Sequence, residues 1–285
     1  MKPPLPAPTK EWHNDTYAAI DPSRPELSAR SKKIVVTGGG YGIGRGVVEA
    51  FAIAGASSIA ILGRKEQPLL DTKDAIESKY KATVSTHIAD VTDVAVLSKA
   101  ASDIGTWDVL VMNAGYMSNP GPSMESDVNE WWKAFEVNIK GSFITAQAFL
   151  PTKGENAVVV ATSTAGVNLP ASMVTNVSSY VASKLGLIKF IEVLAAEHPD
   201  VRFTTIHPGT VETNMFTKSG MLDLPTDKVE LPAHYIVWVS SPEAEFLKGK
   251  FSSCNWDVDE LKANATRVAE GALFTTAIDG ASSLL

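Results

Sequence analysis

The sequence predicts an α/β fold with a single doubly wound parallel sheet flanked by helices. From Lys33 onward, short apolar runs alternate regularly with longer amphipathic stretches. The short runs are rich in Val and Ile and lack strict polar alternation, which is typical of strands buried on both faces of a parallel sheet. Regular alternation of strand and helix implies right-handed crossovers that cover both faces of one sheet.

The predicted elements follow one another without a second period or a long linker. The short apolar runs are the expected strands: Ile34–Thr37, Ser58–Leu62, Thr83–Ile88, Val109–Met112, Ala157–Ala161 and Arg202–Ile206. The amphipathic stretches are the expected helices: Gly42–Ala54, Glu66–Lys79, Asp93–Ser102, Asp127–Leu150 and Ser179–Glu197. Pro151 and Pro199 follow the last two and are expected to end them, because proline lacks the N–H that a helix needs.

Residues 1–30 differ in composition from the rest of the chain. They hold six of the 16 prolines and show no sustained period. We expect an extended N-terminal arm here, which either lies over the main body or is partly disordered. Residues 31–285 are predicted to form one domain.

Charge and composition argue against several classes of function. The net charge of −7 argues against a nucleic-acid partner, because phosphate backbones bind to basic surfaces. No apolar run reaches the roughly 18 residues that a membrane helix needs, so no membrane partner is expected. Cys254 is the only cysteine and the histidines share no ligand spacing, so we expect neither a disulfide nor a metal site. The proline-rich start lacks the apolar segment of a secretory signal, which favours a cytoplasmic location.

A glycine-rich loop, TGGGYGIG at residues 37–44, lies between the first predicted strand and an amphipathic helix. Glycines alone indicate only a turn, since they supply backbone conformations that other residues avoid. Between a buried strand and a helix, however, they let the backbone approach a pyrophosphate, which the helix N-terminus can bind. This position favours a Rossmann-type sheet that binds a dinucleotide.

The end of the second predicted strand, about twenty residues further on, indicates which dinucleotide is bound. A carboxylate there would accept the ribose 2′-hydroxyl of NAD and repel the 2′-phosphate of NADP. Gly63 takes that place, and Arg64 and Lys65 follow it. A guanidinium can pair with a phosphate in bidentate fashion, so we predict NADP(H) as the cofactor. The alternative is that Arg64 is a solvated residue at the start of a helix.

Tyr180 and Lys184 lie four residues apart near the start of the last predicted helix. Four residues advance about 400°, so the two side chains share one face, one turn apart. An ammonium within roughly 5 Å favours the phenolate, so we expect Lys184 to lower the tyrosine pKa below its ordinary value of ~10. The pair would then serve as a general acid or base near neutral pH. The alternative is an ordinary amphipathic helix with a packed tyrosine and a lysine that reaches solvent.

Together with the glycine loop, this pair resembles the short-chain dehydrogenase/reductase (SDR) family from about Lys33 to about Thr213. The resemblance implies that Asp90 contacts the adenine ring and that Thr213 holds the nicotinamide carboxamide. It also implies that Asn113, Ala114 and Gly115 steady the fourth strand and line the cofactor. The full set of cofactor-binding residues is then Gly38, Gly42, Ile43, Gly44, Arg64, Asp90, Val91, Asn113, Ala114, Gly115, Tyr180, Lys184, Pro208, Gly209, Val211 and Thr213.

The catalytic serine of the SDR family stands at the end of the fifth strand, typically about 13 residues before the tyrosine. Val167 occupies that distance here and cannot serve, since it has no hydroxyl. Aligning the Ala-Gly that follows the strand with the family's loop selects Ser163 instead. This choice requires about four extra residues before Tyr180, which a loop tolerates because insertions add little closure entropy. Thr162 and Thr164 remain alternative hydroxyls, although strand alternation places Ser163 on the opposite side from both.

The resemblance implies a catalytic set of Asn138, Ser163, Tyr180 and Lys184. Ser163 would polarise the substrate carbonyl, and Tyr180 would give or take the proton. Lys184 would hold the nicotinamide ribose, and Asn138 would anchor a water that links Lys184 to solvent. The hydride chemistry belongs to the cofactor, while the protein supplies position and electrostatic field.

An apolar substrate loop is expected after Thr213, facing the inserted loop before Tyr180. Its lining would come from Leu169, Met173, Val174, Met215, Phe216, Met221 and Leu222. Such a lining suits a hydrophobic carbonyl compound or alcohol. The proline-rich arm and the C-terminal region resemble fungal SDR members, many of which serve secondary metabolism, and a homodimer or homotetramer is expected. Two alternatives stay open: a non-catalytic NADP(H)-binding regulator or scaffold, and an isomerase or cyclase on the same fold.

Overall fold

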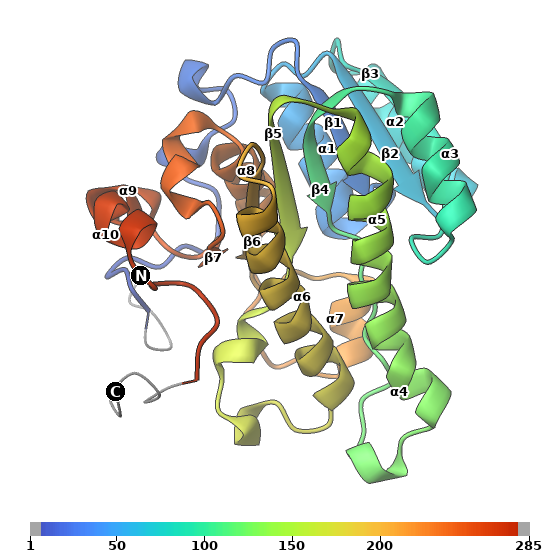
Figure 1. Cartoon of the computed structure of the whole chain (residues 1–285), viewed down its shortest axis with the longest axis vertical. Coiled ribbons are helices and arrows are strands. Elements are labelled where there is room, and N and C mark those ends of the chain that lie inside the picture. The colour runs from blue at the N-terminus through green and yellow to red at the C-terminus, as the bar shows by residue number, and fades with distance from the viewer. Residues whose placement is uncertain (1–6, 279–285) are drawn as a thin grey trace.

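A parallel sheet forms the centre of the molecule in the computed structural model, which describes residues 7–278 (Figure 1). Within these residues the strand order is β3-β2-β1-β4-β5-β6-β7, and every neighbouring pair is parallel. The strands are β1 Lys33–Thr37, β2 Ser58–Gly63, β3 Thr83–Ile88, β4 Trp107–Met112, β5 Lys153–Thr162, β6 Arg202–His207 and β7 Phe251–Ser253. The predicted α/β sheet with its six strands is confirmed. The short strand β7 was not predicted, because its three residues carry no pattern of their own.

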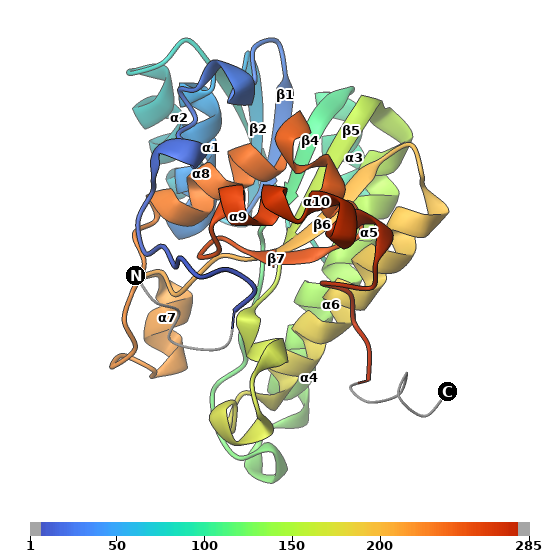
Figure 2. The same ribbon diagram turned by 90° about the vertical axis from the view of Figure 1, so that its left-hand side faces the viewer.

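Helices cover both faces of the sheet, as the doubly wound fold requires (Figures 1 and 2). One apolar core lies between the sheet and α1 Gly42–Ile53, α2 Glu66–Glu77 and α8 Glu230–Val239. The other lies between the sheet and α3 Val94–Ile104, α5 Gly141–Phe149 and α6 Ser178–Glu197. Successive strand residues alternate between the two cores, because strand side chains point to opposite faces. The remaining helices are α4 Val128–Phe135, α7 Asn214–Ser219, α9 Val258–Ala263 and α10 Ala265–Glu270.

The helix predicted over Asp127–Leu150 is interrupted, which corrects the sequence-based boundaries. Helix α4 ends at Phe135, a π-helical turn follows at Glu136–Lys140, and α5 continues the same line (Figure 1). The turn contains Asn138, whose side chain is fully buried and hydrogen-bonded to the backbone of Tyr116. Apolar periodicity cannot reveal this turn, since it depends on a contact with a distant segment. Such π-turns frequently occur at functional sites.

The N-terminal arm packs against the body of the molecule over its described part, residues 7–30 (Figure 2). Ile20 and Leu27 are buried in the same apolar core as α1 and α8. Trp12 forms an isolated antiparallel bridge with Trp256, near the C-terminal helices. Residues 1–6, which belong to the predicted arm, lie outside the described residues. The arm is therefore part of the apolar core and does not merely lie over the surface of the domain.

Among residues 7–278, no helix combines the length and the apolar character that a membrane span requires.

Candidate active site

A cavity of about 750 Å³ opens at the carboxyl edge of the sheet, between the ends of β1 and β4. The strand order reverses at this point, because β2 lies on one side of β1 and β4 on the other. Open α/β sheets bind their ligands in such a crevice. Predicted residues line the cavity as follows: Gly38, Gly42, Ile43, Arg64, Asp90, Val91, Asn113, Ala114, Gly115, Ser163, Tyr180, Lys184, Pro208 and Thr213. The predicted residues Gly44, Asn138, Gly209 and Val211 do not line it.

The glycine loop is fixed to the end of β4 by hydrogen bonds. The hydroxyl of Thr37 accepts the N–H groups of Asn113 and Ala114, each at 3.1 Å, and the Asn113 amide donates to the Thr37 carbonyl at 3.2 Å. Gly38 has a φ of +71°, which favours glycine. A Cβ on Gly44 would lie 2.1 Å from the Gly38 carbonyl oxygen, so only glycine lets α1 begin this close to β1. The arrangement fits a dinucleotide pyrophosphate, which needs close approach to backbone N–H groups.

The end of β2 places a cation at one side of the cavity. Arg64 is exposed there and forms no ion pair with the described residues. Asp90 follows β3 nearby, and its Oδ1 accepts hydrogen bonds from the N–H and the hydroxyl of Thr92 at 2.9 and 2.7 Å. Burial raises the pKa of Asp90, but these hydrogen bonds and the charge of Arg64 outweigh it and hold the pKa below its ordinary value. An ionised carboxylate and an unpaired guanidinium therefore face the same end of the cavity.

Helix α6 brings Tyr180 and Lys184 together, one turn apart, at the other end of the cavity. The Lys184 Nζ lies 5.9 Å from the centre of the Tyr180 ring and donates to the Thr162 carbonyl at 2.7 Å. Burial lowers the pKa of Lys184 to about 8 and raises the pKa of Tyr180 to about 12. The expected lowering of the tyrosine pKa by Lys184 is thus absent from this structure, because desolvation outweighs every favourable contact. With this pKa, Tyr180 is a protonated phenol at neutral pH.

Asn138 lies beside Lys184 but faces the protein interior. Its Oδ1 accepts the Tyr116 N–H, and its Nδ2 donates to the Tyr116 carbonyl and to Ser183 Oγ, each at 2.9 Å. A Cβ added to Gly115 would meet both Lys184 Nζ at 3.3 Å and Asn138 Oδ1 at 3.4 Å. Gly115 thus lies against both side chains, and a larger residue at this position would crowd them.

The end of β5 presents three hydroxyls in different surroundings. Ser163 is 1% exposed, and its Oγ donates to the Lys184 carbonyl at 3.1 Å. Thr164 Oγ1 accepts the Gly166 N–H at 3.1 Å, and the Thr164 side chain acts to lower the pKa of Tyr180. Thr162 Oγ1 is buried without a partner among the described residues. Thr162 and Ser163 both line the cavity, whereas Thr164 does not, so the structure leaves Ser163 and Thr162 as the two hydroxyls at the cavity wall.

The segment after β6 closes the cavity from the side of α7. Thr213 caps α7, its Oγ1 accepting the Phe216 N–H at 3.2 Å. Asp227 accepts the Thr210 N–H at 2.7 Å and holds this segment from outside. Of the apolar residues expected to surround the substrate, only Met215 lines the cavity. The others do not: Leu169, Met173, Val174, Phe216, Met221 and Leu222.

Three polar residues near the cavity were not predicted from the sequence. Tyr116 lines the cavity, and its hydroxyl donates to Glu130 Oε1 at 2.7 Å. Lys218 of α7 donates to the Tyr116 hydroxyl at 3.1 Å and lies 3.4 Å from Glu130 Oε1. The cluster therefore ties α7 to α4 across the mouth of the cavity. The place of Tyr116 directly after Asn-Ala-Gly was a signal for it, whereas nothing in the sequence links Glu130 to Lys218.

Comparison with known proteins gives consistent matches. A family model described as short chain dehydrogenase matches residues 32–221. The short chain dehydrogenase andI of Emericella variicolor is 32% identical over 276 residues, covering 91% of this chain and 92% of that protein. The short chain dehydrogenase pigC of Monascus ruber is 34% identical over 282 residues, covering 92% and 91%.

Solved structures share the fold at lower identity. The oxidoreductase yciK of E. coli has a TM-score of 0.75 and 24% identity, covering 81% of this chain and 98% of that one. A short chain dehydrogenase of Shigella flexneri in complex with NADP has a TM-score of 0.74 and 23% identity, covering 81% and 99%. The L-sorbose reductase of Gluconobacter frateurii, in complex with NADPH and L-sorbose, has a TM-score of 0.72 and 21% identity, covering 80% and 96%.

Proposed function

The chain belongs to the short chain dehydrogenase family, and we propose that it is an NADP(H)-dependent oxidoreductase that interconverts a ketone or aldehyde and an alcohol on a hydrophobic small molecule. The observation that carries this proposal is the position of Tyr180 and Lys184. They share one face of α6 and line the same cavity as the glycine loop. A proton donor and a dinucleotide cradle in one cavity are what carbonyl reduction with a nicotinamide cofactor requires.

The preference for NADP(H) is supported by Arg64. Its guanidinium lies at the cavity without an ion pair among the described residues, and Gly63 stands where a carboxylate would reject a 2′-phosphate. Two of the solved structures with the same fold are complexes with NADP or NADPH. When the cofactor is bound, the hydride would come from, or go to, its nicotinamide ring.

The chain's own residues would then handle the proton and the substrate carbonyl. Tyr180, with a pKa of about 12, is protonated at neutral pH and is therefore ready to donate a proton to a carbonyl oxygen. Lys184, with a pKa of about 8, is largely an ammonium at neutral pH and would hold the ribose hydroxyls. Ser163 would donate to the carbonyl, which requires its hydroxyl to leave the Lys184 carbonyl. Asn138 would fix the backbone around Tyr116 and anchor the proton-relay water near Lys184.

Location, assembly and metabolic role belong to the same proposal. A cytoplasmic location is in keeping with the scarcity of cysteine, since Cys254 is the single cysteine of the sequence and is buried. A homodimer or homotetramer is supported by exposed apolar side chains on α5 and α6, namely Phe143, Leu185 and Val193. A role in secondary metabolism is supported by the fungal origin of the curated relatives.

The proposal is tested by NADPH oxidation with a panel of apolar ketones and aldehydes, followed by mass spectrometry of the products. We expect a product heavier than its substrate by two hydrogen atoms, formed with one equivalent of NADPH. The matched control is Tyr180→Phe, which removes one oxygen and is expected to abolish turnover while NADPH still binds. Binding of NADPH without turnover on any substrate would favour a regulator or scaffold. A product of unchanged mass would favour an isomerase or cyclase.

A further inference from the structure

A second pocket, of about 390 Å³, lies at the amino edge of the sheet, opposite the cofactor cavity. Its walls come from the starts of β4, β5 and β6, the end of α8 and the N-terminal arm. The inner wall is apolar and includes Leu27, Phe51, Val158 and Val237, all at most 5% exposed. Polar and charged side chains make up about half of the lining, so the pocket offers both apolar contacts and hydrogen-bonding groups to a small molecule.

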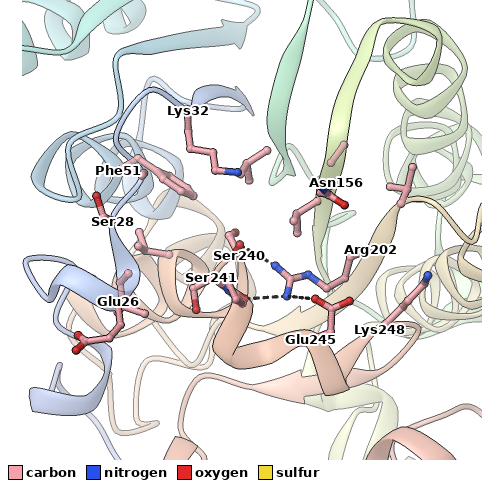
Figure 3. A pocket seen from close by; sticks show the side chains of 18 of the residues that line it. Glu26, Ser28, Lys32, Phe51, Asn156, Arg202, Ser240, Ser241, Glu245 and Lys248 are labelled. Carbon is pink, nitrogen blue, oxygen red and sulfur yellow. Dashed lines mark hydrogen bonds and ion pairs between the residues drawn. The ribbon is translucent and has the colours of Figure 1, made fainter.

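A buried arginine forms one side of this pocket (Figure 3). Arg202 is 9% exposed and donates to the Ser240 carbonyl at 2.7 Å and to the Ser241 carbonyl at 2.8 Å. Its Nε–H is buried and has no acceptor among the described residues. Buried polar groups are almost always hydrogen-bonded, and a buried charge needs an opposite charge close by. Among residues 7–278, the one carboxylate paired with the guanidinium is that of Glu245, which lies 3.8 Å away on a side chain that is 78% exposed. The guanidinium is therefore only partly compensated by the protein.

The pocket is lined by three cations, Lys32, Arg202 and Lys248, and by three carboxylates, Glu26, Asp200 and Glu245. Lys32 forms no ion pair with the described residues, and its side chain reaches into the pocket from the start of β1 (Figure 3). Lys248 donates to the Pro199 carbonyl, which carries no full charge. Two of the lining carboxylates are paired with cations outside the pocket. Glu26 lies 3.5 Å from Arg24, and Asp200 lies 2.9 Å from Lys153.

From this geometry we infer a second ligand site, in which a small organic carboxylate binds between Arg202 and Lys32 with its apolar part against Phe51 and Val158. The ligand is an anion because Arg202 keeps a buried N–H without an acceptor and Lys32 forms no ion pair among the described residues, while Glu26 and Asp200 are paired with Arg24 and Lys153. A carboxylate can accept a charge-assisted hydrogen bond from a guanidinium, and the apolar residues of the wall provide contacts that a hydrated inorganic ion cannot use. The arm supplies Leu27 and Ala29 to the wall, so the ligand also holds the arm against the sheet.

The test is calorimetric titration of the full chain with benzoate, with benzamide as a neutral control of the same shape. We expect benzoate to bind one-to-one in the presence and absence of saturating NADPH, since the pocket lies at the opposite edge of the sheet from the cofactor cavity. Benzamide is expected to bind at least about tenfold more weakly. No heat of binding from benzoate at about 10 mM, equal binding of benzamide, or competition with NADPH would overturn the proposal. Equal affinity for inorganic phosphate would overturn the choice of a carboxylate.

Substitutions locate the site. Lys32→Met and Arg202→Met are each expected to weaken benzoate binding by about tenfold or more, because each removes a charge-assisted contact. The matched control Lys81→Met removes an exposed lysine outside the pocket and is expected to change nothing. If Arg202→Met does not fold, Lys32→Glu decides, since reversing this charge is expected to abolish binding. Unchanged affinity in Lys32→Met and Lys32→Glu would place benzoate elsewhere and refute the site.

Discussion

Ser163→Ala removes one hydroxyl at the edge of the cofactor cavity. The loss of stability follows from the single hydrogen bond that this hydroxyl donates. The hydroxyl donates to the Lys184 carbonyl at 3.1 Å, and that carbonyl keeps its place within α6. A neutral hydrogen bond of this kind contributes about 1 kcal/mol to the free energy of unfolding. For a chain of this size such a loss corresponds to a decrease of about 2 °C in Tm. The variant is therefore expected to be fully folded at assay temperature.

The expected effect of Ser163→Ala on catalysis is much larger. If the hydroxyl polarises the substrate carbonyl, its loss should lower kcat/KM by roughly 10²–10³-fold, or about 2.7–4 kcal/mol, as for other single donors to a developing oxyanion. NADPH affinity should change little, because the hydroxyl is expected to face the substrate. Initial rates of NADPH oxidation, with NADPH binding measured separately by fluorescence, distinguish the two effects.

The neighbouring hydroxyls provide matched controls within the same loop. Thr162→Val and Thr164→Val each remove a hydroxyl at nearly constant volume. Thr164 acts on the pKa of Tyr180, so a larger loss of kcat/KM in Thr164→Val than in Ser163→Ala would refute the assignment of Ser163 and shift the register by one residue. Mild effects in all three variants would leave Tyr180 alone to position the carbonyl and would favour the isomerase or cyclase alternative.

Four further predictions concern the same cavity. Arg64→Asp should weaken NADPH binding by at least about 100-fold and NADH binding much less, since it replaces a phosphate partner with a like charge; equal Kd changes for both cofactors would contradict this. Tyr180→Phe should lower the rate of reduction by orders of magnitude with NADPH affinity retained, and a rate above about a tenth of wild type would assign the proton to another group. Lys184 has a pKa of about 8, and its ammonium is the form that donates to ribose hydroxyls. NADPH affinity should therefore fall as pH rises through about 8. A constant Kd from about pH 6 to pH 10 would refute this role of Lys184. Gly44→Ala places a Cβ 2.1 Å from the Gly38 carbonyl oxygen and should therefore reduce both Tm and NADPH affinity. Thermal unfolding and NADPH titration measure the two effects. Unchanged values would mean that the glycine loop shifts to accept the Cβ at no cost.

Much of the fold was predictable because the strands are local apolar segments with a clear length and composition. The runs around Val35, Ile61 and Val159 are buried on both sides, and burial of this kind requires apolar residues at every position. The C-terminal region gave no such signal. Strand β7 is only three residues long and carries two serines, and it joins the sheet through backbone hydrogen bonds with β6. Helix α8 is buried on nearly all sides, so it lacks the polar face that would mark an amphipathic helix.

The sequence by itself determined which chemical groups stand in the cavity, because the glycine loop, Arg64, Tyr180 and Lys184 are fixed by their positions relative to strand and helix ends. Only the tertiary structure decided how those groups behave. Burial, which depends on all neighbours at once, raises the Tyr180 pKa above its ordinary value where the spacing to Lys184 had suggested a decrease. The hydrogen bond of the Ser163 hydroxyl to the Lys184 carbonyl is likewise set by the exact path of the chain after β5. The second pocket also comes from tertiary structure alone, since it joins the N-terminal arm, the start of β6 and the end of α8, which are far apart in the sequence.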